Sequence, residues 1–382
     1  MNRRVLLLAG EESGVLYAER LGELLRFAGC EVRGYADYEF RTSDLAVMGF
    51  WPVLRRLPYF LGVARTMKRA ICEWRPDVVV TVDYPGLNLK LAAFAKGRGI
   101  PSVHMVCPQV WAWHRNRIPK VAAALSELLC FFPFEPELFD GTGLKAKFIG
   151  HPLVRVVERE NAEQASGDAA QEVGGRIVAL LPGSRIGEIR RILPRLLGAV
   201  SILCKRRAQY GAEASLLRVV IPAANRGAEK EIRRILEATP DLPLTIEVQL
   251  GDARKLLRRA YCAAVASGTA TLEAALARCP TVLVYAVSPM LAWFARRVIT
   301  GVRHVGLANI VAEKCGFEPP MPELLQEAFT SEAVADTLES WIDSADMRKD
   351  AVARLDGAMA HLRADGEPLE IAAKEILGCQ TK

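Results

Sequence analysis

Two short segments in the second half of the chain combine residue types that bind phosphate. The first is LPGSR, at 181–185. In this segment Gly183 allows close approach of the backbone, Ser184 offers a hydroxyl, and Arg185 offers a planar set of donors suited to phosphate oxygens. The segment lacks the spaced glycines and the lysine of a P-loop, so it does not predict ATP hydrolysis. A turn with a solvated arginine is the alternative interpretation.

The second segment is SGTATLEAAL, at 267–276, which follows an apolar stretch. Ser267, Gly268 and Thr269 would begin a helix, where exposed backbone N–H groups and the positive end of the helix dipole favour an anion. Glu273 lies near that start, and its carboxylate can accept both ribose hydroxyls of a nucleotide. Alternatively, Glu273 only complements the helix dipole.

Together the two segments predict a nucleoside diphosphate site. Diphosphate at Gly183, Ser184 and Thr269 with ribose at Glu273 would use both segments. The sequence contains no Asp-x-Asp pair, so we do not expect a metal to bridge the diphosphate. We also expect no cofactor. Helix dipoles and Arg185 would then stabilise a leaving diphosphate.

The first half supplies carboxylates at places where parallel strands would end. Asp83 directly follows the apolar run 78–82, and Glu11 lies in the turn AGEESG, at 9–14. A carboxylate at the end of a buried strand can act as a general base, because partial burial raises its pKa toward a useful range. The alternative for Asp83 is a turn-forming residue before a proline-containing loop.

A third group combines aromatic and basic side chains in CPQVWAWHRNRIPK, at 107–120. On an extended chain Trp111 and Trp113 would share a face, and Arg115 and Arg117 follow with the same spacing. Such a loop can hold an amphiphile with a phosphate, or it can form a hydrated surface between domains.

Two histidines are open to a packing or a ligand-binding interpretation. His114 lies in the aromatic and basic loop, and His151 lies in FIGHPL, at 148–153. His151 comes just before the expected linker, where two domains would face each other across a cleft.

The elements that would position these residues are short apolar runs that alternate with helical patterns. Continuous apolar strands between helices predict parallel sheets covered on both faces. Ligands bind such sheets at the carboxyl ends of the strands, where the segments above lie. The expected strands are 5–8, 78–82, 102–106, 128–132 and 148–149 in the first half, and 177–181, 217–221, 245–248, 262–266 and 281–285 in the second.

The 382 residues suffice for two to three domains of roughly 150 residues each. We expect an α/β protein with one Rossmann-like domain over 1–157 and a second over 176–330. Residues 158–175 hold few large apolar side chains and predict a linker. Residues 331–382 have helical spacing and predict a helical C-terminal segment that packs back on the N-terminal domain or on a partner subunit.

Positive charge is concentrated in the first half. Residues 50–120 hold twelve Lys and Arg against three Asp and Glu, which predicts attraction to polyanions or an anionic membrane. Residues 58–76 have the pattern of a basic amphipathic helix, which fits a membrane surface, although most such helices bury their apolar side in their own core. A second aromatic and basic patch lies at 290–297. No clear nucleic-acid-binding motif accompanies the charge, so we expect no nucleic-acid partner.

The composition excludes several classes of protein. With 51% hydrophobic and 25% charged residues, the chain is globular rather than disordered. No apolar run approaches the roughly 20 residues that span a bilayer, and the run at 5–10 is too short for a signal peptide, so we expect a cytoplasmic protein. Nine cysteines without a CxxC pair indicate reduced core residues rather than a zinc site or disulfides.

Nine short segments stand in a fixed order along the chain. They are AGEESG (9–14), LAVMGF (45–50), VDYPGLN (82–88), PQVWAW (108–113), FPFE (132–135), FIGHP (148–152), LPGSR (181–185), ASGTATLE (266–273), and Asn309 with PELLQ (322–326). In these segments and their order the chain resembles the lipid A disaccharide synthases, over about residues 3 to 330. The set is far more specific than any one of its members.

The resemblance implies a GT-B glycosyltransferase, in which two Rossmann-like domains face a cleft. Such an enzyme joins UDP-2,3-diacylglucosamine to 2,3-diacylglucosamine 1-phosphate through a β-1,6 bond and releases UDP. The resemblance also implies peripheral association with the cytoplasmic face of the inner membrane of Gram-negative bacteria. It further implies a homodimer that exchanges its C-terminal helices.

The resemblance also implies roles for single residues. The catalytic candidates are Asp83, as the base, with Glu11 and Arg185. Glu11, Ser13 and Asn88 would shape the acceptor side, and Arg185, Ser184, Thr269, Glu273 and Asn309 would serve the UDP-sugar. We add Trp111, Trp113, Arg115, His151, Gly183, Ser267 and Gly268 as candidate substrate-binding residues.

The chain departs from the family pattern at two places in the first half. Val15 stands where the family usually has Asp, and residues 34–40 read GYADYEF in place of a glycine-rich stretch. Two alternatives therefore remain: another UDP-sugar enzyme on the same fold, such as an epimerase or a transferase with a different lipid-linked acceptor, or a UDP-sugar-binding protein without activity.

Overall fold

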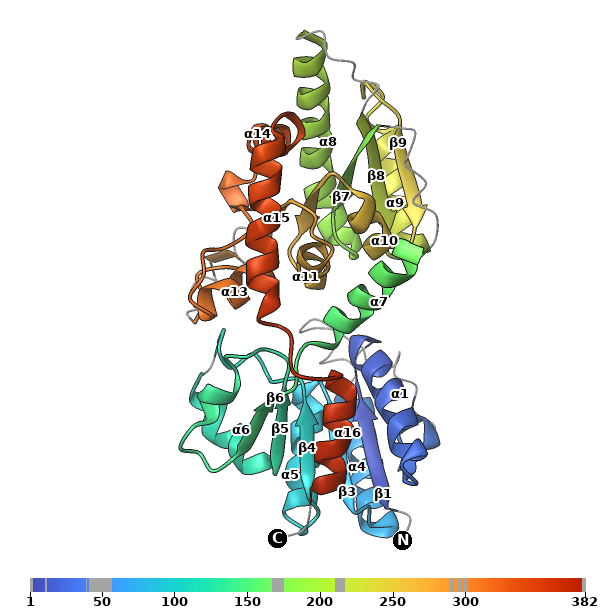
Figure 1. Ribbon diagram of the computed structural model, residues 1–382. Helices are drawn as coiled ribbons and strands as arrows, with labels where there is room; N and C mark the ends of the chain where they lie inside the picture. Colours follow the sequence, from blue (N-terminus) through green and yellow to red (C-terminus); the bar gives the residue numbers. More distant parts are fainter. Residues whose placement is uncertain are drawn as a thin grey trace. The chain divides into compact units, whose positions relative to one another are not determined.

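The computed structural model describes residues 3–379 apart from residues 11, 39, 41–56, 114, 167–174, 210–216, 289–291, 294–296 and 298–300. The chain divides into two compact units. Unit 1 comprises Met1–Arg155 and Leu362–Lys382, and unit 2 comprises Val156–His361. In the described residues each unit holds one parallel sheet of six strands with helices on both faces (Figure 1).

The sheet of unit 1 has the strand order β2-β1-β3-β4-β5-β6. Its strands are β1 (Arg4–Ala9), β2 (Glu31–Arg33), β3 (Val78–Val82), β4 (Ser102–Met105), β5 (Glu127–Cys130) and β6 (Lys145–Phe148). The central strands form because uninterrupted apolar runs can bury both faces, and every side chain of β3 is buried. Ala9 pairs with Val82, so β1 and β3 end side by side.

Helices in two layers cover this sheet. They are α1 (Glu12–Phe27), α4 (Leu57–Trp74), α5 (Pro85–Lys96), α6 (Ile118–Ala124) and α16 (Pro368–Gly378), with single 3-10 turns η1 (Tyr35–Tyr38), η2 (Arg115–Arg117) and η3 (Pro136–Phe139). α1 and α16 bury apolar side chains such as Leu21 and Ile376 against one face. α4, α5 and α6 cover the other face, which they share with residues such as Leu8 and Leu128.

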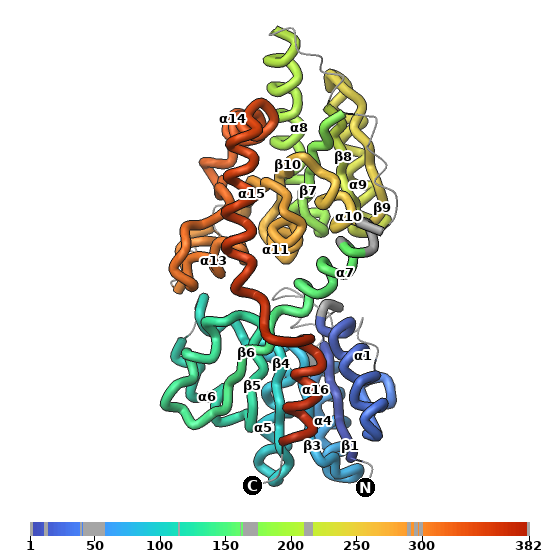
Figure 2. The backbone as a smooth tube through the Cα atoms, in the orientation of Figure 1, coloured from blue at the N-terminus to red at the C-terminus, as the bar shows by residue number. Residues whose placement is uncertain are grey.

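Helix α7 (Pro152–Ser166) begins in unit 1 and continues into unit 2. The expected linker over 158–175 is therefore helical as far as Ser166, and residues 167–174 lie outside the described part of the chain. The expected C-terminal segment, 331–382, is divided between the units. The chain returns to unit 1 at Leu362, and α16 joins the core beside α1 (Figure 2).

The sheet of unit 2 has the strand order β12-β11-β10-β7-β8-β9. Its strands are β7 (Arg176–Leu181), β8 (Leu217–Ala223), β9 (Ile246–Leu250), β10 (Cys262–Ala266), β11 (Thr281–Tyr285) and β12 (Glu323–Leu325). Its helices are α8 (Ile186–Gln209), α9 (Arg226–Glu237), α10 (Ala253–Arg259), α11 (Thr269–Leu276), α13 (Leu307–Lys314), α14 (Ser331–Asp343) and α15 (Ala345–Ala360), with the 3-10 turn η5 (Gln326–Ala328). α8, α9 and α14 share one apolar core with the sheet, and α10 and α11 pack beside the same strands.

The basic amphipathic helix expected at 58–76 is α4. Val63, Met67 and Ile71 are fully buried in the core of unit 1, so most of the apolar side serves packing. Leu61 of this helix is mostly exposed, at 57%. No helix in the described residues combines the length and the apolar character needed to cross a membrane.

Candidate functional site

The clearest pocket of unit 2 lies where the order of its strands reverses. From β7 the chain builds β8 and β9 on one side and then returns to form β10 on the other side. Loops that leave neighbouring strands in opposite directions open a crevice at the carboxyl edge of the sheet. A pocket of about 290 Å³ lies there, lined by Gly183 and Ser184 after β7 and by Ser267, Gly268 and Thr269 after β10.

Gly183 is required by the geometry of the loop after β7. Its φ of +106° lies in the region that favours glycine, and a Cβ here would approach Glu188 Oε2 to 2.7 Å. Arg185 Nη1 lies 3.1 Å from Glu188 Oε1, and the arginine side chain is 60% exposed. Glu188 lines the pocket and Arg185 is not among the lining residues, so the guanidinium is held at the rim by an acid that faces the pocket.

Helix α11 presents its N-terminus to the same pocket. Gly268 precedes the helix with a φ of +154°, and no side chain caps the first turn. Uncapped backbone N–H groups, together with the helix dipole, favour an anion at this position. Ser267 Oγ donates to Val305 O at 3.3 Å. This hydrogen bond connects the loop after β10 with the segment that precedes α13.

Glu273 lies in the second turn of α11 and also lines the pocket. Burial raises the pKa of its carboxyl, and the Arg254 guanidinium, with Nε 3.9 Å from Glu273 Oε1, partly opposes that rise. Arg254 also lies 3.6 Å from Glu160, which in turn pairs with Arg258 at 2.7 Å. Glu273 is thus a partly buried hydrogen-bond acceptor, and the Arg254 guanidinium lies close to its carboxylate.

Asn309 supports the pocket from the interior. Its side chain is fully buried, and its amide donates to Met321 O and to Glu323 Oε1, each at 2.8 Å. Glu323 in turn accepts the backbone N–H groups of Val305 and Gly306. Because Ser267 bonds to Val305, this chain of contacts connects Asn309 with the loop that lines the pocket.

Unit 1 has its own point of strand reversal, between β1 and β3, and Asp83 lies there. Asp83 and Tyr84 both adopt left-handed backbone conformations, with φ of +52° and +50°. Two consecutive residues with side chains in this region cost about 1–3 kcal/mol each, and such strain collects at functional sites. Burial raises the pKa of the Asp83 carboxyl, although Oδ1 accepts the Tyr84 N–H at 2.7 Å.

Asn88 holds this strained turn in place. Its side chain is fully buried, and Nδ2 donates to Asp83 O at 2.8 Å, to Val82 O at 3.2 Å and to Leu8 O at 3.3 Å. Tyr35 Oη donates to its Oδ1 at 2.8 Å. The amide thereby links the ends of β1 and β3 and supports the backbone of Asp83.

Trp111 is likewise an interior residue. Its side chain is 2% exposed, and Nε1 donates to Glu135 Oε1 at 3.1 Å. The second carboxylate oxygen accepts the Phe132 N–H at 3.1 Å. Burial raises the pKa of Glu135 to about 8, and these hydrogen bonds limit the rise. The conformation of the aromatic loop therefore depends on a buried carboxyl.

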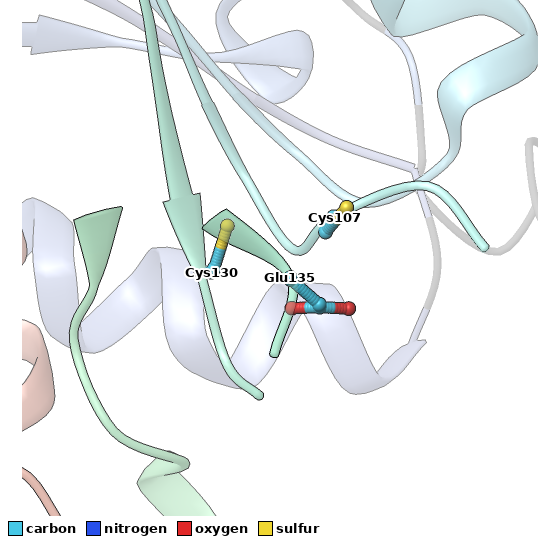
Figure 3. A group of neighbouring side chains, drawn as sticks. All are labelled: Cys107, Cys130 and Glu135. Atoms are coloured by element: carbon cyan, nitrogen blue, oxygen red, sulfur yellow. The ribbon is translucent and has the colours of Figure 1, made fainter. Parts of the chain in front are cut away.

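Cys107, Cys130 and Glu135 bring two thiols and a carboxylate within 4.8 Å of one another (Figure 3). Such a donor set can in principle bind zinc. Both carboxylate oxygens are already held by N–H donors, and the hydrogen bond with Cys130, together with burial, raises the pKa of the Cys107 thiol well above its usual range. We therefore interpret the cluster as part of the core. None of the nine cysteines, all within the described residues, forms a disulfide.

The remaining candidates are divided between surface and interior. Trp113 is 42% exposed, and Arg115 is exposed in η2. His151 is buried, its Nδ1 accepts the Leu153 N–H at 3.2 Å, and burial lowers the pKa of its ring to about 4, which favours the neutral ring. Glu11, His114 and the side chain of Ser13 lie outside the described part of the chain.

Three residues at these sites are not among the candidates that the sequence provides. Tyr35, Glu135 and Arg254 act through partners that lie 53, 24 and 19 positions away along the chain, so spacing alone does not connect them. Glu135 stands in the FPFE segment, and the occurrence of that segment among the nine was the one available indication.

Comparison with known proteins identifies the family of the chain. Residues 5–367 match the lipid-A-disaccharide synthetase family. The chain belongs to this family. The lipid-A-disaccharide synthase of Neisseria meningitidis is 36% identical over 94% of this chain and 89% of its own length. That of Saccharophagus degradans is 33% identical over 98% of this chain and 96% of its own length.

Membership in the lipid-A-disaccharide synthase family makes the chain an enzyme, a glycosyltransferase of lipid A synthesis. Solved structures agree with the GT-B fold. MurG from Acinetobacter baumannii has a TM-score of 0.59 at 15% identity, over 99% of this chain and all of its own. MnaA from S. aureus, in a structure with UDP, has a TM-score of 0.61 at 11% identity, over 98% of this chain and 96% of its own. At these identities the likeness concerns the fold alone.

Proposed function

We propose that the enzyme transfers 2,3-diacylglucosamine from UDP-2,3-diacylglucosamine to 2,3-diacylglucosamine 1-phosphate, with formation of a β-1,6 bond and release of UDP. The observation that carries this proposal is Asp83, a half-buried carboxylate in a strained turn at the point of strand reversal. In a family of glycosyltransferases, such a group is well suited to take a proton from an attacking hydroxyl.

The proposed reaction is a single displacement. Asp83 Oδ2 accepts the proton of the acceptor 6-hydroxyl while that oxygen forms a bond to the anomeric carbon of the donor. The bond from this carbon to the diphosphate oxygen breaks, and UDP leaves with the electron pair. Attack from the side opposite to the leaving group inverts the anomeric configuration and gives the β bond.

The pocket in unit 2 supplies the proposed donor site. The backbone N–H groups at the start of α11 and after Gly183 suit the diphosphate, and Glu273 suits the ribose hydroxyls. Arg185 would exchange Glu188 for a phosphate oxygen when UDP binds, which places a positive charge where negative charge develops on the leaving group.

The acylated substrates support a further proposal, that the enzyme works at the cytoplasmic face of the inner membrane. Trp113 is 42% exposed, and Trp293 is 55% exposed with the Arg297 guanidinium 3.6 Å from its ring. Exposed tryptophans beside cations favour the interface of an anionic membrane. Co-sedimentation with vesicles that contain phosphatidylglycerol should exceed that with neutral vesicles and should fall with added salt.

The test of the proposed reaction is Asp83→Asn, which keeps the size of the side chain and removes the base. We expect turnover to fall about 10² to 10⁴-fold while the Kd of UDP changes less than twofold. Asp140→Asn, an exposed aspartate of the same unit, is the matched control. Unchanged turnover in Asp83→Asn would falsify the assignment of the base.

A second arm of the test concerns the acceptor. UDP-N-acetylglucosamine 2-epimerases share the fold, with a TM-score of 0.59 for the enzyme from Neisseria meningitidis. An epimerase needs no acceptor, so UDP release that depends on added 2,3-diacylglucosamine 1-phosphate, together with a product of disaccharide mass, would distinguish the transferase from it.

A further inference from the structure

A pocket of about 330 Å³ lies in unit 1 between α5 and the segment formed by η2 and α6. It is separate from the pocket of unit 2, and none of the candidate site residues lines it. Its volume is at the lower end of the range for small-molecule sites, about 300–1,000 Å³.

The interior of this pocket is apolar. Leu89, Val121 and Ala124 form its floor, and each is at most 9% exposed. Ala93 on α5 and Ala123 on α6 line it from exposed positions, where their small side chains leave room between the helices. A surface of this kind suits a hydrocarbon chain better than a polar ligand.

Three cations line the same pocket, namely Lys90, Arg117 and Lys120. No acidic residue lines it, and none of the three cations forms an ion pair with the described residues. Lys145 and Lys147 of the same unit, by contrast, both pair with Glu375. Three unpaired cations beside an apolar pocket favour an anionic amphiphile.

One end of the pocket adjoins the proposed base. Pro85 and Gly86 line it, and Pro85 lies two residues after Asp83, which is roughly 7 Å of chain at most. These residues begin α5, whose N-terminus has no side-chain cap, so its N–H groups and dipole add to the attraction for an anion.

We propose that this pocket binds the acceptor, with an acyl chain between α5 and α6 and the phosphate among Lys90, Arg117 and Lys120. The inference rests on the proposed function, because it is the acceptor whose hydroxyl meets Asp83. An acylated sugar phosphate supplies both features that the pocket requires, a hydrocarbon chain and a compact negative charge.

The first experiment measures binding of dodecyl phosphate to the full chain by calorimetry, without donor or turnover. We expect this probe to bind at least tenfold more tightly than inorganic phosphate. Ala93→Trp, which fills the pocket from an exposed position, should remove this advantage. The triple variant Lys90→Ala, Arg117→Ala and Lys120→Ala should weaken binding at least tenfold.

Matched controls separate the pocket from general charge and hydrophobicity. The triple variant Arg65→Ala, Arg69→Ala and Lys374→Ala removes three exposed cations of the same unit that do not line the pocket. Ala28→Trp adds an exposed tryptophan elsewhere on unit 1. Both controls should bind dodecyl phosphate as the parent protein does. An equal loss in the control triple, or no gain from the dodecyl chain, would overturn the proposal.

A second experiment distinguishes the acceptor from a membrane phospholipid with the same chemistry. In Ala93→Trp the KM for the acceptor should rise at least tenfold while the KM for the UDP-sugar and binding to phosphatidylglycerol vesicles stay unchanged. A variant that loses vesicle binding and keeps its KM for the acceptor would show that the pocket holds a phospholipid, against our proposal. Failure of the proposed reaction would appear separately, as UDP release that does not depend on acceptor.

Discussion

The candidate sites of the two units lie at the same point of similar sheets, where the strand order reverses, and they are built in different ways. In unit 2, glycines and uncapped N–H groups leave an open pocket after β7 and β10. In unit 1, a packed network of Tyr35, Asn88 and the strand ends holds Asp83 in a strained turn. A site that receives a charged group needs space and donors, whereas a site that aims one carboxylate needs packing.

The groups that act on the pKa of the candidate carboxylate also differ between the two units. The pKa of Asp83 is raised by burial and is opposed only by a backbone N–H. The pKa of Glu273 is also raised by burial, but Arg254 opposes the rise. Burial therefore raises the proton affinity of both carboxylates, and they differ in the neighbour that opposes the rise, a backbone N–H at Asp83 and a guanidinium at Glu273.

The largest effect within this comparison is expected from Gly183→Ala. The substitution forces a side chain into a φ of +106° and against Glu188, so the loop must move. We expect the Kd of UDP to rise about 100-fold, by titration calorimetry. Gly187→Ala is the control, because a Cβ there has no neighbour within 4 Å. If Gly183→Ala bound UDP with an affinity within threefold of the parent protein, the proposal that UDP binds in the pocket of unit 2 would be wrong.

The next effect compares two buried amides, one in each unit. Asn88→Ala leaves the Asp83 turn without its support, so turnover should fall at least tenfold with UDP affinity unchanged. The free energy of unfolding should fall by about 2–4 kcal/mol, because buried acceptors lose their donor. Asn309→Ala should show the reverse pattern, with weaker UDP binding. Identical kinetic losses in both variants would contradict the division of roles.

A moderate effect on stability is expected from the buried carboxyl of unit 1. Glu135 has its pKa raised from 4.5 to about 8, so between these values the unfolded chain ionises while the folded chain keeps its proton. Its contribution to stability is complete below about pH 4.5 and is lost as the pH rises to about 8, by up to about 1.4 kcal/mol per pH unit. Chemical unfolding of Glu135→Gln across this range should lack that slope; parallel curves would refute the assignment.

The smallest effect concerns Arg254→Ala in unit 2. Without the guanidinium the pKa of Glu273 should rise further, and a protonated carboxyl accepts ribose hydroxyls poorly. As the pH is lowered, UDP affinity measured by calorimetry should therefore fall about threefold further in this variant than in the parent protein. Arg259→Ala, an exposed arginine on the same helix, should behave like the parent.

Most of the architecture could be predicted from the sequence because apolar runs mark buried parallel strands. The runs 78–82, 262–266 and 281–285 coincide with β3, β10 and β11. The two strands that were missed, β2 and β12, are three-residue strands at the edges of their sheets, and Glu31–Arg33 carries two charges. Edge strands need few apolar residues, so the pattern that identifies a central strand does not identify them.

The candidate sites were predictable where local chemistry decides and unpredictable where burial decides. Gly183, Ser184, Ser267, Gly268, Thr269 and Glu273 stand in segments that suit a diphosphate and a ribose, and all six line one pocket. Polar residue types alone do not separate a ligand from a structural amide. Asn88 and Asn309, both expected to serve the substrates, are fully buried with their amides bonded to the protein, and residue type and spacing do not reveal that burial.

Unit 1 is formed by two separate stretches of the chain, and this affects both the synthesis of the protein and the ways in which it can be divided. The chain leaves unit 1 beside the place where it comes back, since the His151 N–H donates to Leu362 O at 2.9 Å. Unit 2 is therefore an insertion, and a ribosome completes it while the first sheet still lacks α16, its last covering helix. Splicing residue 155 directly to residue 362 would remove the whole insert and leave unit 1 as one continuous chain.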